Sequence, residues 1–423
     1  MKNIHRSAVL ILVCFLSLLY SNAQDRNGLR VEAPEKHGLS PERLERLSVN
    51  LERELAVRKT PGAAVLIMRH GVIVYEETFG EQDMVTETPM YLNSIFRIYS
   101  MTKPITSVAV MMLWEQGYFR LDDPVSLYIP EFSEMKVAIE NEDQSEILRL
   151  EKPKREITIQ DLLRHTSGLT YGIFGKPTAV RQAYLNTNLS PSQQTIEEFI
   201  EKIVHLPLIA HPGERWEYGY STDVLGHLVE KISGLSLEAF FDKHILIPLK
   251  MEDTGFFIPE EKLPRAAQGF DYSINSYPAH LKDVARPPLM HSGGGGLVST
   301  LYDYARFSQM MLNGGELDGV RLLSPKTVEL MTSNHVEASV DRGDLYLPGP
   351  GYGFGLGYAV RLVPGISAMA GSQGNYRWGG WAGTGIWIDP REELIAIYMM
   401  QDVASASYLR ERFKNLVYQA IVK

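Results

Sequence analysis

The stretch "FRIYSMTKPITSVAVMMLWEQG", residues 96 to 117, has apolar positions all around a helix rather than on one face. Seven of the ten residues from Ile105 to Trp114 are large and apolar. This pattern predicts a helix buried on all sides instead of an amphipathic surface helix. A buried helix is a rigid support, and Ser100 and Lys103 lie near its start. Pro104 removes an early helical donor and disfavours helical angles at Lys103, so we expect an irregular helix start.

The region before this helix predicts one helix and two strands. Residues 40–59 combine a Ser cap, Pro41 at the first helical position, Glu42 in the first turn and apolar residues at helical spacing, which predicts an amphipathic helix. Residues 62–80 predict two strands of a β-hairpin that turns at His70-Gly71.

The middle of the chain is predicted to be helical. Residues 133–156 are charged and poorly hydrophobic, so we expect an exposed excursion there and assign it no function. Helices follow at 157–169, with Thr158 as cap, and at 194–204 and 223–232.

Strands return at the end of the chain, from Tyr352 onward, in "GFGLGYAV", "NYRWGGWAGTGIWID" and "ELIAIYMMQ", and an amphipathic helix over 408–422 closes it. Strands and helices at both ends, with helices between them, predict an α+β fold whose sheet is assembled from both termini around an inserted helical lobe. We expect an α/β lobe at about 37–100 and 286–423 and a helical lobe at about 101–285.

The first 23 residues predict a secretory signal peptide. They combine a short basic region, an apolar run from Ala8 to Tyr20 and small residues before Gln24, where we expect cleavage. An uncleaved anchor is less favoured, because the apolar run is shorter than the roughly 20 residues of a spanning helix. The sequence therefore predicts an exported bacterial protein, periplasmic or secreted, with no stable membrane insertion after cleavage.

Composition narrows the chemistry further. The only cysteine, Cys14, lies inside the predicted signal peptide, which excludes thiol catalysis and cysteine metal sites in the mature chain. Loss of Lys2 and Arg6 with the signal peptide lowers the formal net charge from −9 to −11. No basic stripe is interleaved with aromatic residues, so nucleic-acid binding is not expected.

A nucleophile and its base are predicted at Ser100 and Lys103. An i,i+3 spacing places both side chains on one helix face, within reach of each other. The same spacing occurs at Ser133 and Lys136, but that pair lies in a charged run and is interpreted as surface.

A serine hydroxyl needs an activating base, which a Lys or a Tyr phenolate can provide. "HPGERWEYGYSTDVLGHLVE" offers Tyr218 and Tyr220 as tyrosine candidates.

Three motifs together resemble the serine β-lactamase-related family, which includes class C β-lactamases, D-alanyl-D-alanine peptidases and family VIII carboxylesterases. "SMTK" at Ser100 matches the Ser-x-x-Lys nucleophile motif, "YGY" at Tyr218 matches the position of the tyrosine motif, and "WGG" at Trp378 lies where penicillin-recognising members carry Lys-Thr-Gly. The stretches "LLRHTSGL", "PGERW", "DVLG" and "SGGGGLVST" are also similar, so the resemblance covers nearly the whole mature chain.

The resemblance implies an α/β sandwich around an antiparallel sheet, a helical lobe, and a site in the groove between them. It implies that Ser100 forms an acyl-enzyme while Lys103 and Tyr218 transfer protons, and which of the two is the base stays open. It assigns the oxyanion hole to the amides of Ser100 and Trp381. A rival alignment of the third motif with "AGTG", at 382–385, shifts that second amide a few residues on.

Two departures from the family bear on the substrate. Trp378 replaces the cationic Lys of the third motif, and Tyr220 replaces an amide side chain of the second motif. Both changes favour neutral, partly apolar acyl esters over anionic amides. Tyr99, Phe174 and Trp381 are candidate pocket residues, and the predicted substrate-binding residues are Tyr220, Trp378, Gly379, Gly380 and Tyr171.

Other chemistry is weakly supported. The four glycines at 293–296 lack a following Gly-Lys-Ser/Thr and indicate a closely approached backbone rather than a phosphate loop. Pairs such as Asp161 with His165 supply two ligands each, so neither a metal site nor a cofactor is predicted. His165 and His291 are interpreted as hydrogen-bonded structural histidines.

The favoured function is an exported serine carboxylesterase acting on neutral acyl esters, and the expected partner is a small-molecule ester or peptide substrate. The alternatives are a D,D-peptidase or β-lactamase, and a non-catalytic binding protein on the same scaffold. The oligomeric state is not predicted.

Overall fold

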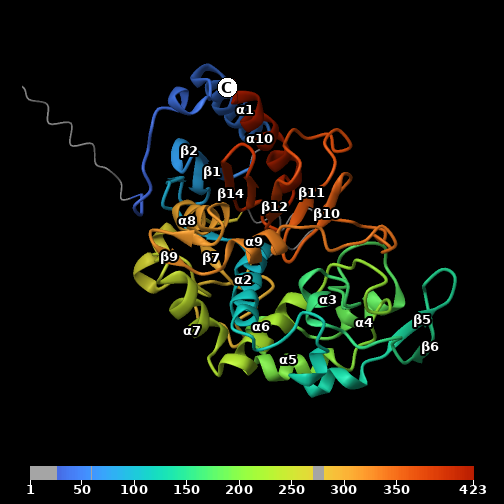
Figure 1. Ribbon diagram of the computed structural model, residues 1–423. Coiled ribbons are helices and arrows are strands. Elements are labelled where there is room, and N and C mark those ends of the chain that lie inside the picture. Colours follow the sequence, from blue (N-terminus) through green and yellow to red (C-terminus); the bar gives the residue numbers. More distant parts are fainter. Residues whose placement is uncertain (1–25, 59, 270–280) are drawn as a thin grey trace, which may run out of the picture.

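One eight-stranded antiparallel sheet joins the two ends of the chain (Figure 1). In the computed structural model, which describes residues 26–58, 60–269 and 281–423, its strand order is β10-β11-β12-β13-β14-β1-β2-β3. The N-terminal hairpin pairs through β1 with β14, the last strand of the C-terminal set, so the predicted sheet built from both ends is confirmed. The strands are β1 (Gly62–Arg69), β2 (Val72–Asp83), β3 (Thr88–Pro89), β10 (Tyr352–Phe354), β11 (Ala359–Arg361), β12 (Tyr376–Gly379), β13 (Gly385–Asp389) and β14 (Leu394–Met400).

Helices cover both faces of this sheet. All eight residues of β1 are buried, and successive side chains point to opposite faces. Ala63, Val65 and Ile67 pack with α1 (Pro41–Arg58) and α10 (Ala406–Ala420). Their neighbours Ala64, Leu66 and Met68 join the larger core around α2 (Thr102–Glu115) and α8 (Leu301–Leu312). The layered α+β architecture predicted from the sequence is therefore confirmed.

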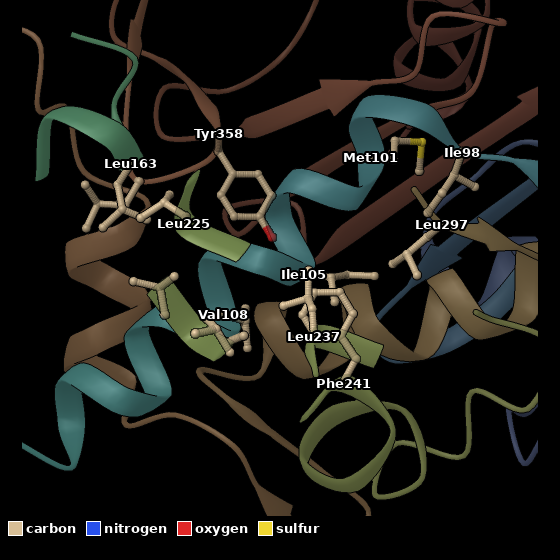
Figure 2. Packing of buried hydrophobic residues seen from close by; sticks show 14 of the residues in the cluster. Ile98, Met101, Ile105, Val108, Leu163, Leu225, Leu237, Phe241, Leu297 and Tyr358 are labelled. Atoms are coloured by element: carbon tan, nitrogen blue, oxygen red, sulfur yellow. The ribbon is translucent and has the colours of Figure 1, made fainter. Parts of the chain in front are cut away.

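The apolar helix is α2 (Thr102–Glu115), which runs through the centre of the molecule (Figure 1) and belongs to the larger core. Every residue from Thr102 to Leu113 is buried, which confirms the prediction of a helix without an exposed face. Ile105 and Val108 meet residues from several other segments, among them Leu237 and Phe241 (Figure 2). The helix is preceded by a 3₁₀ turn over Tyr99–Met101, so its start is irregular as expected.

Five helices that follow α2 lie on the side of the molecule opposite α1 and α10 (Figure 1). They are α3 (Ile159–Leu163), α4 (Ala179–Asn186), α5 (Ile196–Ile203), α6 (Ser221–Ser233) and α7 (Leu237–Phe241), and α9 (Pro325–Met331) follows α8. Thr158 caps α3 as predicted, but the helix is shorter than the expected 157–169. The lobe boundaries predicted near residues 100 and 286 stay predictions.

Part of the excursion at 133–156 is ordered as a hairpin of β5 (Val137–Glu140) and β6 (Ile147–Glu151), which the composition did not predict. Ser133 and Lys136, which repeat the Ser-x-x-Lys spacing, are exposed as expected. The remaining short strands pair as β4 (Phe96–Arg97) with β7 (Val298–Ser299), and as β8 (Glu316–Leu317) with β9 (Val320–Arg321).

The predicted signal peptide, its cleavage point before Gln24 and Cys14 lie outside the described residues. Among the helices of the described ranges, none is long and apolar enough to cross a membrane.

Candidate active site

Lys103, at the start of α2, makes hydrogen bonds to three separate segments of the chain. The residue is 1% exposed, and its Nζ donates to Ser100 Oγ at 3.3 Å, to the Tyr171 hydroxyl at 3.0 Å and to the Gly294 carbonyl at 2.6 Å. An ammonium group has three protons to donate, and here each has an acceptor. The structure thus brings together Ser100 and Lys103, which the i,i+3 spacing predicted to be neighbours.

The backbone before Ser100 is strained. Tyr99 has φ +42°, a left-handed angle that non-glycine residues rarely adopt. Its side chain is held because its hydroxyl accepts a hydrogen bond from the Lys282 amide at 3.0 Å. The turn therefore presents Ser100 at the end of a rigid helix from a conformation that the surrounding structure has to maintain.

The glycine run at 293–296 lies against both α2 and α6, so the closely approached backbone that the sequence indicated is confirmed. A Cβ on Gly293 would lie 2.7 Å from the Thr222 carbonyl, and one on Gly294 would lie 2.4 Å from Asp223 Oδ2. Glycine is required for this approach, which lets the Gly294 carbonyl reach Lys103.

Asp223 is a charged group of the site that sequence reasoning missed. Its carboxylate accepts hydrogen bonds from Ser292 Oγ at 2.5 Å and from the Gly294 amide at 3.1 Å. Burial raises the pKa of Asp223, whereas the positive charge of Lys103 and these hydrogen bonds lower it. Asp223 lies in the first turn of α6, a position that the sequence pattern marks only as a helix start.

The ring of Tyr218, rather than its hydroxyl group, lies next to the Lys103 amine. Lys103 Nζ is 4.6 Å from the ring centroid, and the Tyr218 hydroxyl is buried without a hydrogen-bond partner among the described residues. The hydroxyl that bonds Lys103 belongs instead to Tyr171, whose pKa is raised well above its usual value by burial and then by the charge of Asp223. The sequence had named Tyr171 as a substrate-binding residue only.

His165 supports the Tyr218 ring from behind, with ring centroids 4.9 Å apart. The expectation that His165 is hydrogen-bonded is wrong for its Nδ1, which is buried and has no partner in the described part of the chain. Burial, and then the charge of Lys103, hold the pKa of His165 well below its usual value.

The third motif ends beside Ser100. The Gly380 amide donates to the Thr384 carbonyl at 2.8 Å, and Thr384 Oγ1 donates to the Ile98 carbonyl at 3.3 Å, which joins the end of β12 to the backbone just before Ser100. Trp381 is 43% exposed and packs edge-on against Tyr99, at 5.9 Å between centroids. The assignment of the Ser100 and Trp381 amides to an oxyanion hole stays a prediction.

Two pockets of about 360 and 370 Å³ meet at Ser100, and both are lined by Phe174, Tyr218 and Trp381. The first, which we call the arginine pocket, is also lined by Leu347, Arg377, Trp378, Gly379, Gly380, Arg410 and Glu411. The second, the apolar pocket, is also lined by Tyr99, Tyr171, Leu189, Pro191, Tyr220 and Met290. All the predicted substrate-binding residues therefore line one of the two pockets.

The sequence expectation of an uncharged wall at Trp378 needs correction. Trp378 itself is apolar and buried, but the guanidinium groups of Arg377 and Arg410 line the same pocket. Arg377 is the preceding residue on β12, and Arg410 comes from α10, which is distant in sequence. The motif alone shows nothing of this contribution from α10.

Within the described ranges, no group of three or more His, Cys, Asp or Glu side chains is arranged to hold a metal ion. The pair of His227 and Glu230 lies 3.7 Å apart, and His165 faces aromatic rings rather than Asp161.

The sequence matches a family model and is similar to several known proteins. The family model described as Beta-lactamase matches residues 49–420. Protein Rv1367c of Mycobacterium tuberculosis is 35% identical over 351 residues, which are 80% of this chain and 85% of that protein. Esterase EstB of Burkholderia gladioli is 29% identical over 366 residues, covering 81% of this chain and 86% of the esterase.

The fold is shared with solved structures. The structure of EstCE1, described as a hydrolase with promiscuous acyltransferase activity, superposes with a TM-score of 0.74 at 24% identity, over 89% of this chain and 99% of that one.

Proposed function

The chain belongs to the beta-lactamase family, and on that premise we propose that it is a serine hydrolase that cleaves carboxylic esters through an acyl-enzyme on Ser100. The observation that carries the proposal is the buried Lys103 amine within hydrogen-bond distance of Ser100 Oγ. A serine becomes a nucleophile when a neighbouring base accepts its proton.

In the first half of the reaction, Ser100 Oγ attacks the ester carbonyl carbon as its proton passes to the base. The candidate bases are Lys103 in its neutral amine form and Tyr218 in its phenolate form, and Tyr171 and Asp223 lie near Lys103. Collapse of the tetrahedral intermediate breaks the ester C–O bond, and a proton returns to the leaving alcohol. Water then attacks the acyl-enzyme by the same proton transfers in reverse. The amides of Ser100 and Trp381 are proposed to stabilise the oxyanion of both intermediates.

Esters are favoured over amides for two reasons. Tyr220 stands where penicillin-recognising members have a side chain suited to hydrogen-bonding a substrate amide, and its ring packs among Tyr171, Tyr184 and Phe199 instead. The similarity to esterase EstB points the same way. The apolar pocket fits a neutral, apolar half of the ester.

We further propose that the protein works after export, in the periplasm or outside the cell, because residues 1–23 have the composition of a signal peptide. Its partner is a small-molecule ester.

The test is a side-by-side panel of 4-nitrophenyl butyrate, a D-Ala-D-Ala peptide and a coloured cephalosporin. We expect ester turnover, and Ser100→Ala should abolish it. Retained ester hydrolysis in Ser100→Ala would overturn the assignment of the nucleophile. Turnover that strongly favours the cephalosporin or the peptide would assign the same machinery to a β-lactamase or D,D-peptidase.

Labelling with a fluorophosphonate probe separates these enzymes from a non-catalytic binding protein. Wild-type protein should be labelled on Ser100, and Lys103→Met should slow the labelling. Failure of the wild type to label would favour the binding protein.

A further inference from the structure

We propose that the arginine pocket binds a carboxylate carried by one half of the ester substrate, while the apolar pocket holds the other half. This inference rests on the proposed function and names its substrate class: esters with one acidic half and one apolar half. Both pockets open at Ser100, so the two halves of an ester attached there would extend into different surroundings.

Arg410 lies in a slot made by glycines. Gly379 of β12 pairs with Gly385 of β13, and a Cβ on either would lie 2.2 or 2.7 Å from the Arg410 side chain. In this slot Arg410 Nη1 donates to the carbonyls of Gly380 at 3.0 Å and Thr384 at 2.9 Å. The same bonds hold the backbone of the third motif, so the guanidinium is fixed at the edge of the catalytic groove. Its other nitrogens make no hydrogen bond with the described residues.

Arg377 brings the second guanidinium to this pocket. Its Nη2 donates to the Pro348 carbonyl at 2.8 Å, and the group lies 4.8 Å from the ring centroid of Tyr352. This stacking orients the planar guanidinium without neutralising it. Its Nε is buried and has no partner among the described residues. Arg377 Nη1 and Arg410 Nη2 also make no hydrogen bond with the described residues, and they are not buried as this Nε is. A carboxylate in the pocket would satisfy these two donors, because its oxygens match the guanidinium geometry.

The charge balance of the pocket favours an anion. Arg377 and Arg410 face one carboxylate in the lining, that of Glu411, which is exposed. Burial, and then the charge of Arg377, lower the pKa of Arg410 to about 10, so its guanidinium group stays charged at neutral pH. The chain has a net charge of −9, but the two guanidinium groups make the potential inside this partly enclosed pocket positive. A positive potential there would favour binding of an acidic group.

The apolar pocket accounts for the other half of the ester. Leu189, Pro191 and Met290 line it together with the rings of Tyr99 and Tyr171. Its charged lining groups, Asp223, Lys282 and Asp283, include two carboxylates and therefore would not attract a third.

Matched ester pairs test the inference. In the first pair the charge is on the acyl half: the 4-nitrophenyl monoester of glutaric acid has a free carboxylate, and its methyl ester is the neutral partner. In the second pair the charge is on the alcohol half: the butyrate of 4-hydroxybenzoic acid has a free carboxylate, and its methyl ester is the neutral partner. The readout is the ratio of kcat/KM for the charged ester to that for the neutral one. A high ratio in either pair supports the inference and identifies the half that enters the arginine pocket.

Variants assign that preference to the pocket. Arg377→Gln should lower the ratio by about tenfold, the effect expected for loss of a hydrogen bond between charged groups. Arg377→Lys should lower it less, and Glu411→Gln should raise it. Arg412→Gln is the matched control, since Arg412 is also on α10 but bonds Asn50, away from the pocket. Thermal unfolding of each variant identifies any loss of folding.

The inference is overturned if neither charged ester is preferred, or if Arg377→Gln and Glu411→Gln leave the ratio within twofold of the wild type. That outcome leaves the proposed esterase function standing, because the neutral esters are still hydrolysed. If no ester is hydrolysed, calorimetric titration of Ser100→Ala with glutarate tests the pocket without turnover. Binding that Arg377→Gln weakens about tenfold supports the pocket, and absence of binding overturns it.

Discussion

The two tyrosines beside Lys103 should differ in what their hydroxyl groups do, and Tyr→Phe substitutions can separate them. The Tyr171 hydroxyl accepts one of the three hydrogen bonds of the buried Lys103 ammonium group, whereas the Tyr218 hydroxyl has no partner in the described structure. A hydroxyl that is buried without a partner is costly to the folded state, so Tyr218 is the better candidate for a group whose bonds form only in the transition state.

The structure gives the expected magnitudes. Tyr171→Phe leaves one Lys103 proton without an acceptor at a site that is 1% exposed, which should lower the free energy of unfolding by about 1.5–3 kcal/mol. Tyr218→Phe removes an unsatisfied hydroxyl, so the free energy of unfolding should be unchanged or rise by up to about 1 kcal/mol. Its kcat should fall by roughly 10²–10⁴-fold, the usual contribution of a positioned acid or base.

The measurements are kcat for 4-nitrophenyl butyrate and urea unfolding on the same preparations. Tyr358→Phe is the matched control, because the Tyr358 hydroxyl is also buried without a partner among the described residues but lines neither pocket. It should reproduce the stability change of Tyr218→Phe and leave kcat within twofold. The reasoning is refuted if Tyr218→Phe keeps kcat within threefold of the wild type, or if it destabilises the protein as Tyr171→Phe does.

Three further substitutions test other parts of the structure. Gly379→Ala should lower the free energy of unfolding by about 1–3 kcal/mol and reduce ester turnover, because the added Cβ would lie 2.2 Å from Arg410 Nη1. Unchanged urea unfolding would contradict the close packing of Arg410 against Gly379. Burial raises the pKa of Asp303 from 3.8 to about 7, so the folded state keeps a proton that the unfolded state releases, and stability should fall as pH rises from 4 to 7 by up to about 1.4 kcal/mol per unit. Asp303→Asn should flatten that slope in unfolding curves measured across this range, and an unaltered slope would show that other groups cause it. Arg181→Met should lower the free energy of unfolding by about 3–5 kcal/mol, because the buried carboxylate of Glu217 beside the catalytic groove loses its ion-pair partner. In urea unfolding, the double variant with Glu217→Gln should recover part of this loss.

Much of the fold could be read from local patterns. The full-circumference apolar run predicted α2, because a helix without a polar face has to be buried wherever it lies. Two short apolar runs on either side of His70-Gly71 predicted the β1–β2 hairpin, since its strands pair with each other across a short turn. The hairpin at β5 and β6 was not predicted, because its strands are short, charged and partly exposed and so lack a hydrophobic period.

The sequence by itself predicted that Ser100 and Lys103 are neighbours, because the two residues are one helical turn apart at the start of an apolar helix that has to be buried. Only the tertiary structure decided what surrounds this pair. Tyr171 and Asp223 come from separate segments, and Arg410 comes from the last helix of the chain. Tyr171 and Asp223 reach the groove from the middle of the chain, whereas Arg410 reaches it because the last helix packs back beside β12 and β13. Long-range packing of this kind leaves no local period in the sequence, which is why Trp378 alone suggested an uncharged pocket.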